Sequence, residues 1–307
     1  MSLTKVRPIV VGIGELLWDV FPGGKTLGGA PVNFARHCNQ LGASGYPVSC
    51  VGADENGAEL MEGLASLQMD SAYVSKDYHH DTGSVQVTLD ENGTPSYDIR
   101  EGVAWDVLGI SEKLEALAPT VDAVCFGSLA QRHSVSRATI LAFLGKMSPQ
   151  ALKLFDVNLR QDYFSQSILQ ESLEQATVFK LSDEELPVLA DLFALEGSVE
   201  AQLLVLEERF ELDCIAYTRG ANGSLLLSRA ELSDHPGCPT EMVDSVGAGD
   251  AFAATLCLGL IAGWPLSKLN ENANQVAAYV CSQRGATPDL PIYLVNRISS
   301  QSEASHL

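Results

Sequence analysis

The sequence predicts an α/β fold with a doubly wound, mostly parallel sheet that has helices on both of its faces. Short segments of apolar and β-branched residues each end in a polar or glycine-containing turn, and amphipathic segments of helical length lie between them. Strands that are apolar throughout and alternate with helices indicate a parallel sheet covered on both sides. The predicted strands are residues 9–12, 46–51, 121–126, 152–157, 178–181 and 214–218, and the predicted helices include residues 33–41, 57–67, 136–147 and 199–210.

The composition is typical of a globular protein, and the length suits one large α/β domain or two modest ones. We expect a single domain over residues 1–307. Of the 307 residues, 46% are hydrophobic and 19% are charged, which excludes wholesale disorder. The formal net charge is −20, from 39 acidic and 19 basic residues. A surface this negative repels nucleic acid and anionic lipid, so neither is an expected partner. An anionic ligand such as ATP would need helix N-termini, a few basic side chains and Mg²⁺ to bind it.

Cysteine usage and hydropathy predict a cytoplasmic protein. The seven cysteines are scattered and never occur at CxxC spacing, so we expect neither a disulfide framework nor a zinc site. No apolar segment of the signal-peptide type precedes the first predicted strand. The longest uncharged run, residues 251–267, is about one helical turn shorter than a bilayer span and contains Gly259, Gly263 and Pro265. We therefore expect a buried helix there and no association with a membrane.

One region departs from the α/β pattern. Residues 84–90 alternate strictly between apolar and polar side chains, Asn92-Gly93 follows, and Tyr97 and Ile99 resume the alternation. This pattern predicts a β-hairpin with one apolar face. Such a face must cover something, and the candidates are a bound substrate, a subunit interface, or both. We expect a small β lid from roughly residues 16–30 and 82–106, and a homodimer through lid strands is one expectation.

The segment Asp244-Ser245-Val246-Gly247-Ala248-Gly249-Asp250 carries the strongest chemical signal. Two close glycines lead into an apolar helix, so successive N–H groups and the positive end of a helix dipole point at one place. Asp250 at the helix start is a candidate general base for a hydroxyl group, worth ~10²–10⁴ in rate. The alternative role is simple stabilisation of the helix dipole, but that role does not need two glycines. The arrangement predicts phosphoryl transfer.

A second glycine turn, Gly28-Gly29, enters a helix that carries Asn33, whose amide can both donate and accept hydrogen bonds. Asp19 is interpreted as an acceptor for sugar hydroxyls. Gly12 and Gly14 suggest a dinucleotide-binding loop, but Leu17 occupies the place of the third glycine and Glu15 would repel a pyrophosphate. No Walker A loop occurs in the sequence.

Polar residues and glycines also follow three of the predicted strands, in residues 156–160, 180–185 and 218–223. Each group alone is typical of turns and caps. Because the carboxyl ends of parallel strands share one edge of the sheet, the three groups together predict the rim of an active site.

These motifs together resemble the PfkB/ribokinase family of carbohydrate kinases over essentially the whole chain. Residues 244–250 are similar to the family's D-T-x-G-A-G-D signature, with Ser245 in place of Thr. The segment Gly-Gly-Ala-Pro-Val-Asn-Phe-Ala at residues 28–35, followed by Gly42 and Gly52, resembles the N-terminal signature. The resemblance implies a ribokinase-like fold, with ATP, Mg²⁺ and a sugar as ligands.

The resemblance also implies a role for each matching residue. Asp250 would be the base, and the N–H groups of Gly247, Ala248 and Gly249 would hold the migrating phosphoryl group. Glu185 would act on Mg²⁺ through water, and Asp244 with residues 284–286 resembles a monovalent-cation site that could bind K⁺. Ser182 replaces the Asn of the family's N-x-x-E motif. The sugar would contact Asp19, Gly28, Gly29 and Asn33, and the nucleotide would contact Lys180, Ser182, Thr218, Gly220, Gly223 and Asn274.

The acceptor is predicted from the segments that surround the sugar. Residues 97–100, 103–106 and 126–132 are similar to fructokinase members, and Arg100, Gln131 and Arg160 are candidate sugar contacts. Arg132 could form a basic cluster with Arg100 and Arg160 that binds a sugar already carrying a phosphate. The nearby carboxylates of Asp98 and Asp106 weaken this interpretation. The leading hypothesis is phosphorylation of D-fructose to fructose 6-phosphate. Alternatives are ribose, 2-keto-3-deoxygluconate or a nucleoside as acceptor, and a non-catalytic sugar or nucleotide sensor; an NAD-dependent enzyme is the weakest.

Overall fold

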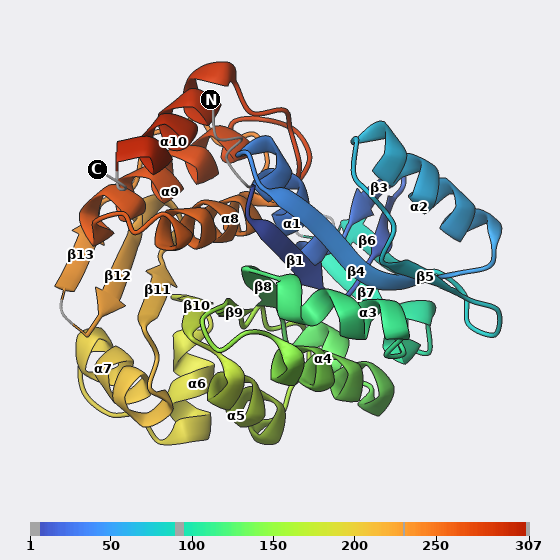
Figure 1. Cartoon of the computed structure of the whole chain (residues 1–307), viewed down its shortest axis with the longest axis horizontal. Helices are drawn as coiled ribbons and strands as arrows, with labels where there is room; N and C mark the ends of the chain where they lie inside the picture. The colour runs from blue at the N-terminus through green and yellow to red at the C-terminus, as the bar shows by residue number, and fades with distance from the viewer. Residues whose placement is uncertain (1–6, 90–94, 230, 305–307) are drawn as a thin grey trace.

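The computed structural model describes residues 7–89, 95–229 and 231–304. Within them a nine-stranded sheet forms the centre of the molecule, and its strand order is β13-β12-β11-β10-β9-β8-β1-β4-β5 (Figure 1). In this order, the strands from β11 through β10, β9, β8, β1 and β4 to β5 run parallel to one another. The two remaining strands, β12 and β13, are antiparallel to their neighbours at one edge of the sheet. The strands are β1 (Ile9–Ile13), β4 (Ser44–Gly52), β5 (Val74–Asp77), β8 (Ala123–Phe126), β9 (Leu152–Asp156), β10 (Val178–Ser182), β11 (Cys214–Thr218), β12 (Ser224–Ser228) and β13 (Glu231–His235).

Helices cover both faces of this sheet, as the sequence predicts. Alternate residues of a strand face opposite sides, so Val10 packs with one layer of helices and Val11 with the other. One layer contains α1 (Ala30–Gln40), α8 (Ala248–Ile261), α9 (Leu266–Cys281) and α10 (Ile292–Ala304). The other contains α3 (Glu112–Leu117), α4 (Ser134–Lys146), α5 (Gln166–Gln175), α6 (Leu186–Phe193) and α7 (Val199–Phe210), while α2 (Glu55–Ser66) packs beside α1 near the second sheet.

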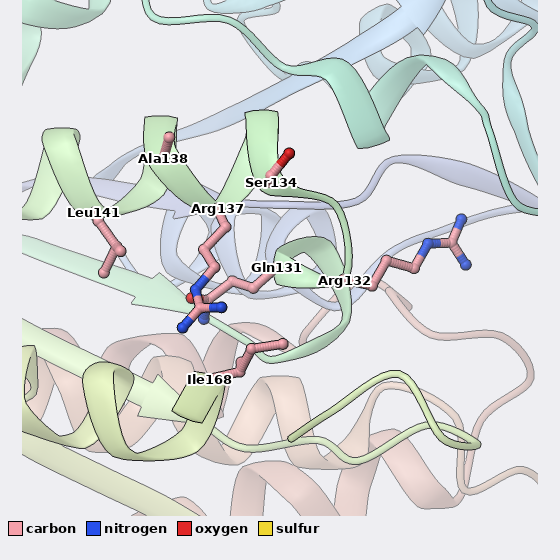
Figure 2. A pocket seen from close by; sticks show the side chains of 7 residues that line it. All are labelled: Gln131, Arg132, Ser134, Arg137, Ala138, Leu141 and Ile168. Carbon is pink, nitrogen blue, oxygen red and sulfur yellow. The ribbon is translucent and has the colours of Figure 1, made fainter. Parts of the chain in front are cut away.

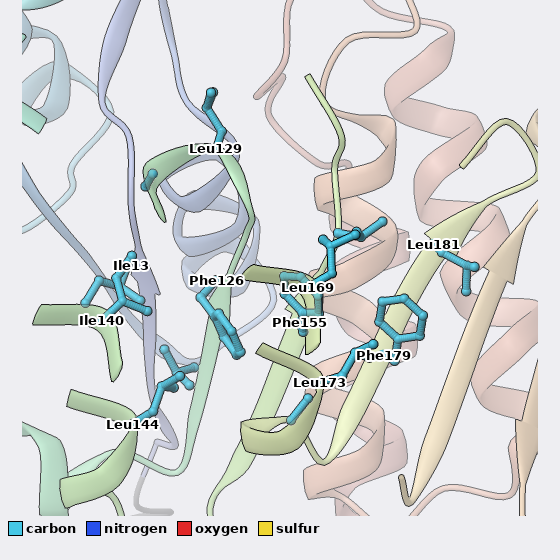
Figure 3. Close-up of a cluster of buried hydrophobic side chains, with 14 of the residues drawn as sticks. Ile13, Phe126, Leu129, Ile140, Leu144, Phe155, Leu169, Leu173, Phe179 and Leu181 are labelled. Atoms are coloured by element: carbon cyan, nitrogen blue, oxygen red, sulfur yellow. The ribbon is translucent and has the colours of Figure 1, made fainter. Parts of the chain in front are cut away.

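The core beneath α4 and α5 contains a row of phenylalanines. Phe126, Phe155 and Phe179 occupy paired positions on β8, β9 and β10, and their rings stack at 5.2 and 5.7 Å (Figure 3). All three are fully buried, and leucines of α5 lie over them. Stacked aromatic rings across neighbouring strands hold the strand ends in register. The loops that follow these strands are therefore carried on a rigid support.

A second sheet of four strands, in the order β3-β2-β6-β7, lies beside the main sheet. Its strands are β2 (Leu17–Phe21), β3 (Gly24–Gly28), β6 (Gly83–Leu89) and β7 (Pro95–Ile99). They fall within the two stretches from which a lid is expected. The turn Asn92-Gly93 lies outside the described residues. β6 and β7 pair antiparallel, and β2 joins β6 in parallel.

The apolar face of the hairpin packs on the chain itself. Val85, Val87 and Ile99 are buried in the same cluster as Trp105, which lies on the short 3-10 helix η1 (Ala104–Val107). Within one chain, these apolar residues of the hairpin are therefore covered by packing around Trp105.

The long uncharged run forms a buried helix, as predicted. Residues 251–259 of α8 are all buried between the sheet and α9. In the described part of the chain, no helix has the length and apolar character needed to cross a membrane.

Candidate active site

Asp250 lies in the first turn of α8, behind a glycine whose conformation only glycine adopts easily. Gly247 caps the helix with φ of 79°, and its Cα packs so closely on Ala286 that a Cβ would overlap the carbonyl of that residue. Ala251 N–H donates to Gly247 O at 2.9 Å. Of the three expected donors, Ala248 N–H already donates to Ser245 O at 3.4 Å, whereas over the described ranges no acceptor is found for the N–H groups of Gly247 and Gly249, nor for that of Asp250. The start of α8 thus offers free donors to an anion, beside a carboxylate.

Asn33 connects the two glycine turns of the sequence. Its Nδ2 donates to Asp250 Oδ2 at 2.8 Å, although the residues are far apart in the chain. The side chain is only 4% exposed, and its Oδ1 has no hydrogen-bond donor among the residues that the structure describes. Gly29, with φ of 118°, caps α1 and brings Asn33 to this position. A buried acceptor without a donor is costly, so the site suits a ligand that carries hydroxyl groups.

Burial raises the pKa of Asp250 to about 6, and the negative charge of Asp156 adds to this effect. The hydrogen bond from Asn33 acts in the opposite direction because it stabilises the charged form, as do the charges of Lys180 and Arg160. A carboxylate with a raised pKa is a better proton acceptor near neutral pH than an ordinary aspartate.

Glu15 is a residue of the site that the sequence reasoning missed. It is 4% exposed, and its Oε1 accepts a hydrogen bond from Ala30 N at 3.2 Å, at the first residue of α1. Burial raises the pKa of Glu15 to about 7, and the charge of Asp250 also raises it. The sequence signal is a glutamate between Gly14 and the second glycine turn, where its expected effect is only to repel a pyrophosphate.

Gly28 pairs with Leu17 in the β2–β3 hairpin, and the carboxylate of Asp19, two residues further along β2, reaches the α-carbon of Gly28. A Cβ at Gly28 would collide with Oδ2 of Asp19. Burial raises the pKa of Asp19 to about 6, and the charge of Arg160 opposes this shift. The absence of a side chain at residue 28 therefore leaves room for the carboxylate of Asp19.

Lys180 lies beneath the start of α8 in a buried ion pair. Its Nζ donates to both carboxylate oxygens of Asp156, at 2.9 and 2.8 Å. A Cβ built at Gly249 would lie 3.4 Å from the same Nζ, so the ammonium group is close to the free N–H groups. Burial alone would favour the neutral amine, but the carboxylates of Asp156 and Glu185 outweigh it and raise the pKa of Lys180. A permanent positive charge thus lies next to the anion-binding turn.

The loop after β9 carries Arg160 in a strained backbone. Asn158 and Gln161, on either side of it, have φ of 41° and 46°, and such values are unusual for residues other than glycine. Arg160 is exposed, and its charge lowers the pKa of Glu15, Asp19 and Asp250. Its positive charge therefore acts on the same carboxylates, while its Nη1 donates to Leu159 O at 2.9 Å. A narrow cavity is lined by Glu15, Asp156 and Asn158, together with the start of α1 and the end of β8.

The structure does not bring Arg100 and Gln131 to this cluster. Arg100 forms an exposed ion pair with Asp81 at 2.6 Å. The amide nitrogen of Gln131 donates to Gly127 O at 2.9 Å and to Ser172 Oγ at 2.8 Å, because the 3-10 turn at Leu129–Gln131 directs it toward α5. Gln131 lines a cavity of about 310 Å³ between α4 and α5, and Arg137 of α4 lines the same cavity (Figure 2).

Glu185 follows β10 and caps α6. Its Oε1 accepts from Leu159 N at 2.9 Å and its Oε2 from Ser182 N at 2.7 Å, so it connects the loops after β9 and β10. Across the described residues no group of three His, Cys, Asp or Glu side chains forms a metal cage. The carboxylate of Glu185 retains lone pairs that can accept from metal-bound water.

The other expected nucleotide contacts follow β11 and lie on α9. Thr218 ends β11, and its hydroxyl donates to Leu181 O at 3.3 Å. Gly220 and Gly223 bound a 3-10 turn in which both have positive φ. Asn274 is buried, and its Nδ2 donates to Ser224 Oγ at 2.7 Å and to Asn270 O at 2.8 Å. The bond to Ser224 attaches α9 to β12, so the amide nitrogen of Asn274 has a structural function.

At the expected cation site, the carboxylate of Asp244 joins its own loop to the loop of residues 284–286. Asp244 accepts from Val246 N and from Gly285 N, both at 3.0 Å. His37 on α1 contacts Ala286 O through Nε2 at 3.0 Å, and burial lowers its pKa to about 4, so this ring is neutral and Nε2–H donates. Helix α1, the 284–286 loop and the start of α8 are therefore packed as one unit.

Comparison with known proteins agrees with this geometry. The sequence profile described as pfkB family carbohydrate kinase matches residues 12–292. The sugar kinase PH1459 of Pyrococcus horikoshii is 31% identical over 297 residues, which cover 91% of each chain. Its crystal structure in complex with ATP, titled as that of an uncharacterized sugar kinase, aligns with a TM-score of 0.78 at 30% identity, over 94% of this chain and 99% of that one.

Several relatives are named fructokinase. The fructokinase of Salmonella typhimurium is 28% identical over 297 residues, covering 91% of this chain and 95% of the relative. The fructokinase of Vibrio cholerae, whose structure contains fructose, ADP and calcium ion, aligns with a TM-score of 0.77 at 25% identity. That alignment covers 94% of this chain and 98% of the other.

Proposed function

Because this chain belongs to the PfkB family of carbohydrate kinases and is an ATP-dependent sugar kinase, we propose that its acceptor is D-fructose and its product fructose 6-phosphate. Fructokinases are found among both its sequence relatives and its structural neighbours. The observation that carries the proposal is the half-buried carboxylate of Asp250, bonded to Asn33 beside the free N–H groups of α8.

In the proposed reaction, Asp250 accepts the proton of the acceptor hydroxyl. The hydroxyl oxygen forms a bond to the γ-phosphorus of ATP, and the bond from that phosphorus to the β–γ bridging oxygen breaks, so that ADP leaves. Asn33 orients the carboxylate through the 2.8 Å hydrogen bond. Its Oδ1, which lacks a donor among the described residues, is suited to a second sugar hydroxyl.

Charge on the transferring group is stabilised by donors already in place. The N–H groups of Gly249 and Asp250 point out of the start of α8, and Lys180 lies beside them. Removing one such preorganised donor typically costs ~3 kcal/mol of transition-state stabilisation. Asp156 holds Lys180 in place through two hydrogen bonds, so no reorganisation is needed when the phosphoryl group arrives.

The residues present fit Mg²⁺ bound mainly by the nucleotide. Mg²⁺ commonly retains several waters and takes substrate phosphates as ligands, and it would supply charge neutralisation at the β- and γ-phosphates. Glu185 would hold it through water, with the carboxylate oriented by Leu159 N and Ser182 N. Asp244 and the 284–286 loop are the proposed place for K⁺.

Two ion pairs favour an unphosphorylated acceptor. A sugar that already carries a phosphate needs free cationic side chains, and Arg100 and Arg132 are the candidates beside Arg160. Arg132 is paired with Asp106 and Arg100 with Asp81, which leaves their charges compensated. Fructose therefore fits this site better than a fructose phosphate.

The proposal is tested by measuring ADP release with a panel of acceptors. D-fructose is expected to give the highest kcat/KM among fructose, ribose, 2-keto-3-deoxygluconate, a nucleoside and fructose 6-phosphate. Phosphorus NMR of the product should show a phosphate ester on the 6-hydroxyl. A higher kcat/KM with another acceptor would replace fructose, and sugar binding without ADP release would indicate a sensor.

The role of Asp250 is tested separately with Asp250→Asn. This variant should keep the fold and sugar binding while kcat falls at least ~10²-fold. Asp122→Asn is the matched control, because Asp122 accepts from Ile9 N just before β8 and lies at the opposite end of the strands. Turnover of Asp250→Asn near that of the control would contradict the assignment.

A further inference from the structure

Arg132 occupies a buried position between two aromatic rings. Its side chain is 6% exposed, and its guanidinium carbon lies 4.0 Å from the ring centre of Trp105 and 4.6 Å from that of Tyr163. In Figure 2 the side chain extends away from the other residues that line the α4–α5 cavity. Its position is therefore set by these rings and not by that cavity.

Three polar contacts attach Arg132 to the segment that follows β7. Nε donates to Asp106 Oδ1 at 2.8 Å, and Nη2 donates to Asp106 Oδ2 at 2.9 Å and to Arg100 O at 2.6 Å. We call residues 100–106 the return segment, since they lead from the second sheet back to the main domain. The planar fork of arginine matches a carboxylate with two parallel bonds, which lysine cannot reproduce.

The return segment is firmly joined to the second sheet. Arg100 N donates to Ser84 O on β6 at 3.1 Å, and Ala104 N donates to Asp81 O at 2.8 Å. The indole of Trp105 packs against Gly83 so closely that a Cβ there would overlap it. A movement of β6 and β7 must therefore move the return segment or break these contacts.

Tyr163 brings the loop after β9 into the same assembly. Its hydroxyl donates to Glu101 Oε1 at 2.8 Å and lies 3.3 Å from Ile99 O. This loop also carries Arg160, whose charge acts on Asp19 and Asp250. Arg132, stacked on Tyr163 and bonded to Asp106, thus lies between the second sheet and a loop of the site.

We propose that Arg132 is a positioning residue that holds the return segment in place, so that the second sheet and the loop of Arg160 close over the sugar together. The inference rests on the proposed acceptor site between Asp19, Asn33 and Asp250. It assigns Arg132 to the affinity and retention of the sugar, and not to contact with the nucleotide or with a substrate phosphate.

The test compares Arg132→Lys with Arg137→Lys. The first substitution keeps the charge but removes the fork and the planar stack. The second is a matched control, because Arg137 is the neighbouring arginine on α4 and pairs with the half-exposed Glu171 at 2.8 Å. Steady-state kinetics with each substrate and hydrogen–deuterium exchange of peptides spanning residues 83–89 and 95–107 are measured for both variants and the wild type.

For Arg132→Lys we expect the KM of the sugar to rise at least ~10-fold while the KM of ATP stays within ~2-fold. Deuterium uptake of the two peptides should become faster in the absence of substrates. Arg137→Lys should leave all these quantities unchanged. An unchanged sugar KM in Arg132→Lys, or a proportional rise in both KM values together with a lower Tm, would overturn the proposal.

The experiment separates this inference from the choice of fructose. If another sugar is the better acceptor of the wild type, the same ratios are measured with that sugar. The exchange measurement needs no acceptor at all. Uptake in Arg132→Lys that equals that of the wild type would contradict the inference whatever the acceptor is.

Discussion

Asn33 and Asp250 are separated by 217 positions in the chain and joined by a hydrogen bond of 2.8 Å. The bond connects the start of α1, which follows the Gly28-Gly29 turn, with the start of α8, which follows the Gly247-Ala248-Gly249 turn. A sugar held by the first turn is thereby presented to the base and donors of the second. The two helix starts act as one site because of this contact.

The pH dependence of kcat/KM should report the raised pKa of Asp250. The base acts when deprotonated, so activity is present above its pKa of about 6 and is lost as the pH falls through that value. Glu15 and Asp156 interact electrostatically with it, so the observed midpoint belongs to the coupled cluster. Rates measured from about pH 5 to 9 should show the acidic limb near 6; constant activity down to about pH 5 would disagree.

Asn33→Ala should move that acidic limb to higher pH. The amide donates to the charged form of Asp250 and so lowers its pKa; removing the donor raises the pKa. The position of the limb is the quantity to compare, because the substitution also removes a sugar contact and lowers the rate. Asn39→Ala on the same helix, where the amide bonds only to Gly45 in the described structure, is the control and should leave the limb in place.

Gly28→Ala should weaken sugar binding specifically. The new Cβ would collide with Oδ2 of Asp19 and displace the carboxylate. We expect the KM of the sugar to rise ~10-fold or more with little change in the KM of ATP. Gly23→Ala lies in the same hairpin, where a Cβ meets no atom within 4 Å, and should behave as wild type. Equal effects of the two substitutions would argue against a sugar contact at Asp19.

Gly247→Ala should damage the anion-binding turn beyond the cost of its backbone conformation. The residue has φ of 79° and its Cβ would overlap Ala286 O. Gly263→Ala has a similar φ of 66° but open space around the Cβ, so it isolates the conformational cost, on the order of 1 kcal/mol. We expect kcat to fall at least ~10-fold for Gly247→Ala and to be unchanged for Gly263→Ala. Similar kcat values for both would remove the turn from the mechanism.

Lys180→Met should separate stability from catalysis at the buried ion pair. Leaving the charge of Asp156 unpaired costs about 3–5 kcal/mol in the free energy of unfolding, measured with urea. The double variant Lys180→Met/Asp156→Asn removes both charges and should regain much of that stability. It should not regain kcat, because the ammonium beside Gly249 is still missing. A double variant with wild-type turnover would show that Lys180 has only a structural role.

The sequence predicted the positions of the parallel strands along the chain well, because each strand depends on a local pattern of apolar residues. Apolar runs gave the positions of β1, β8, β9, β10 and β11 to within a few residues. It did not predict β12 and β13, because segments with mixed polar and apolar residues at an edge have no distinct period. Nor did it show that the apolar face of the hairpin lies on Trp105 of the same chain.

By itself, the sequence determined the class of fold and the two glycine turns, since apolar periodicity and the conformational freedom of glycine are properties of neighbouring residues. Only the tertiary structure decided which charged side chains meet. It buried Glu15 beside Asp250, and it formed the ion pairs of Lys180 with Asp156 and of Arg132 with Asp106. The physical reason is that desolvation and ion pairing depend on atoms from segments that are distant in the sequence. A local sequence pattern does not specify which of those segments pack together in the core.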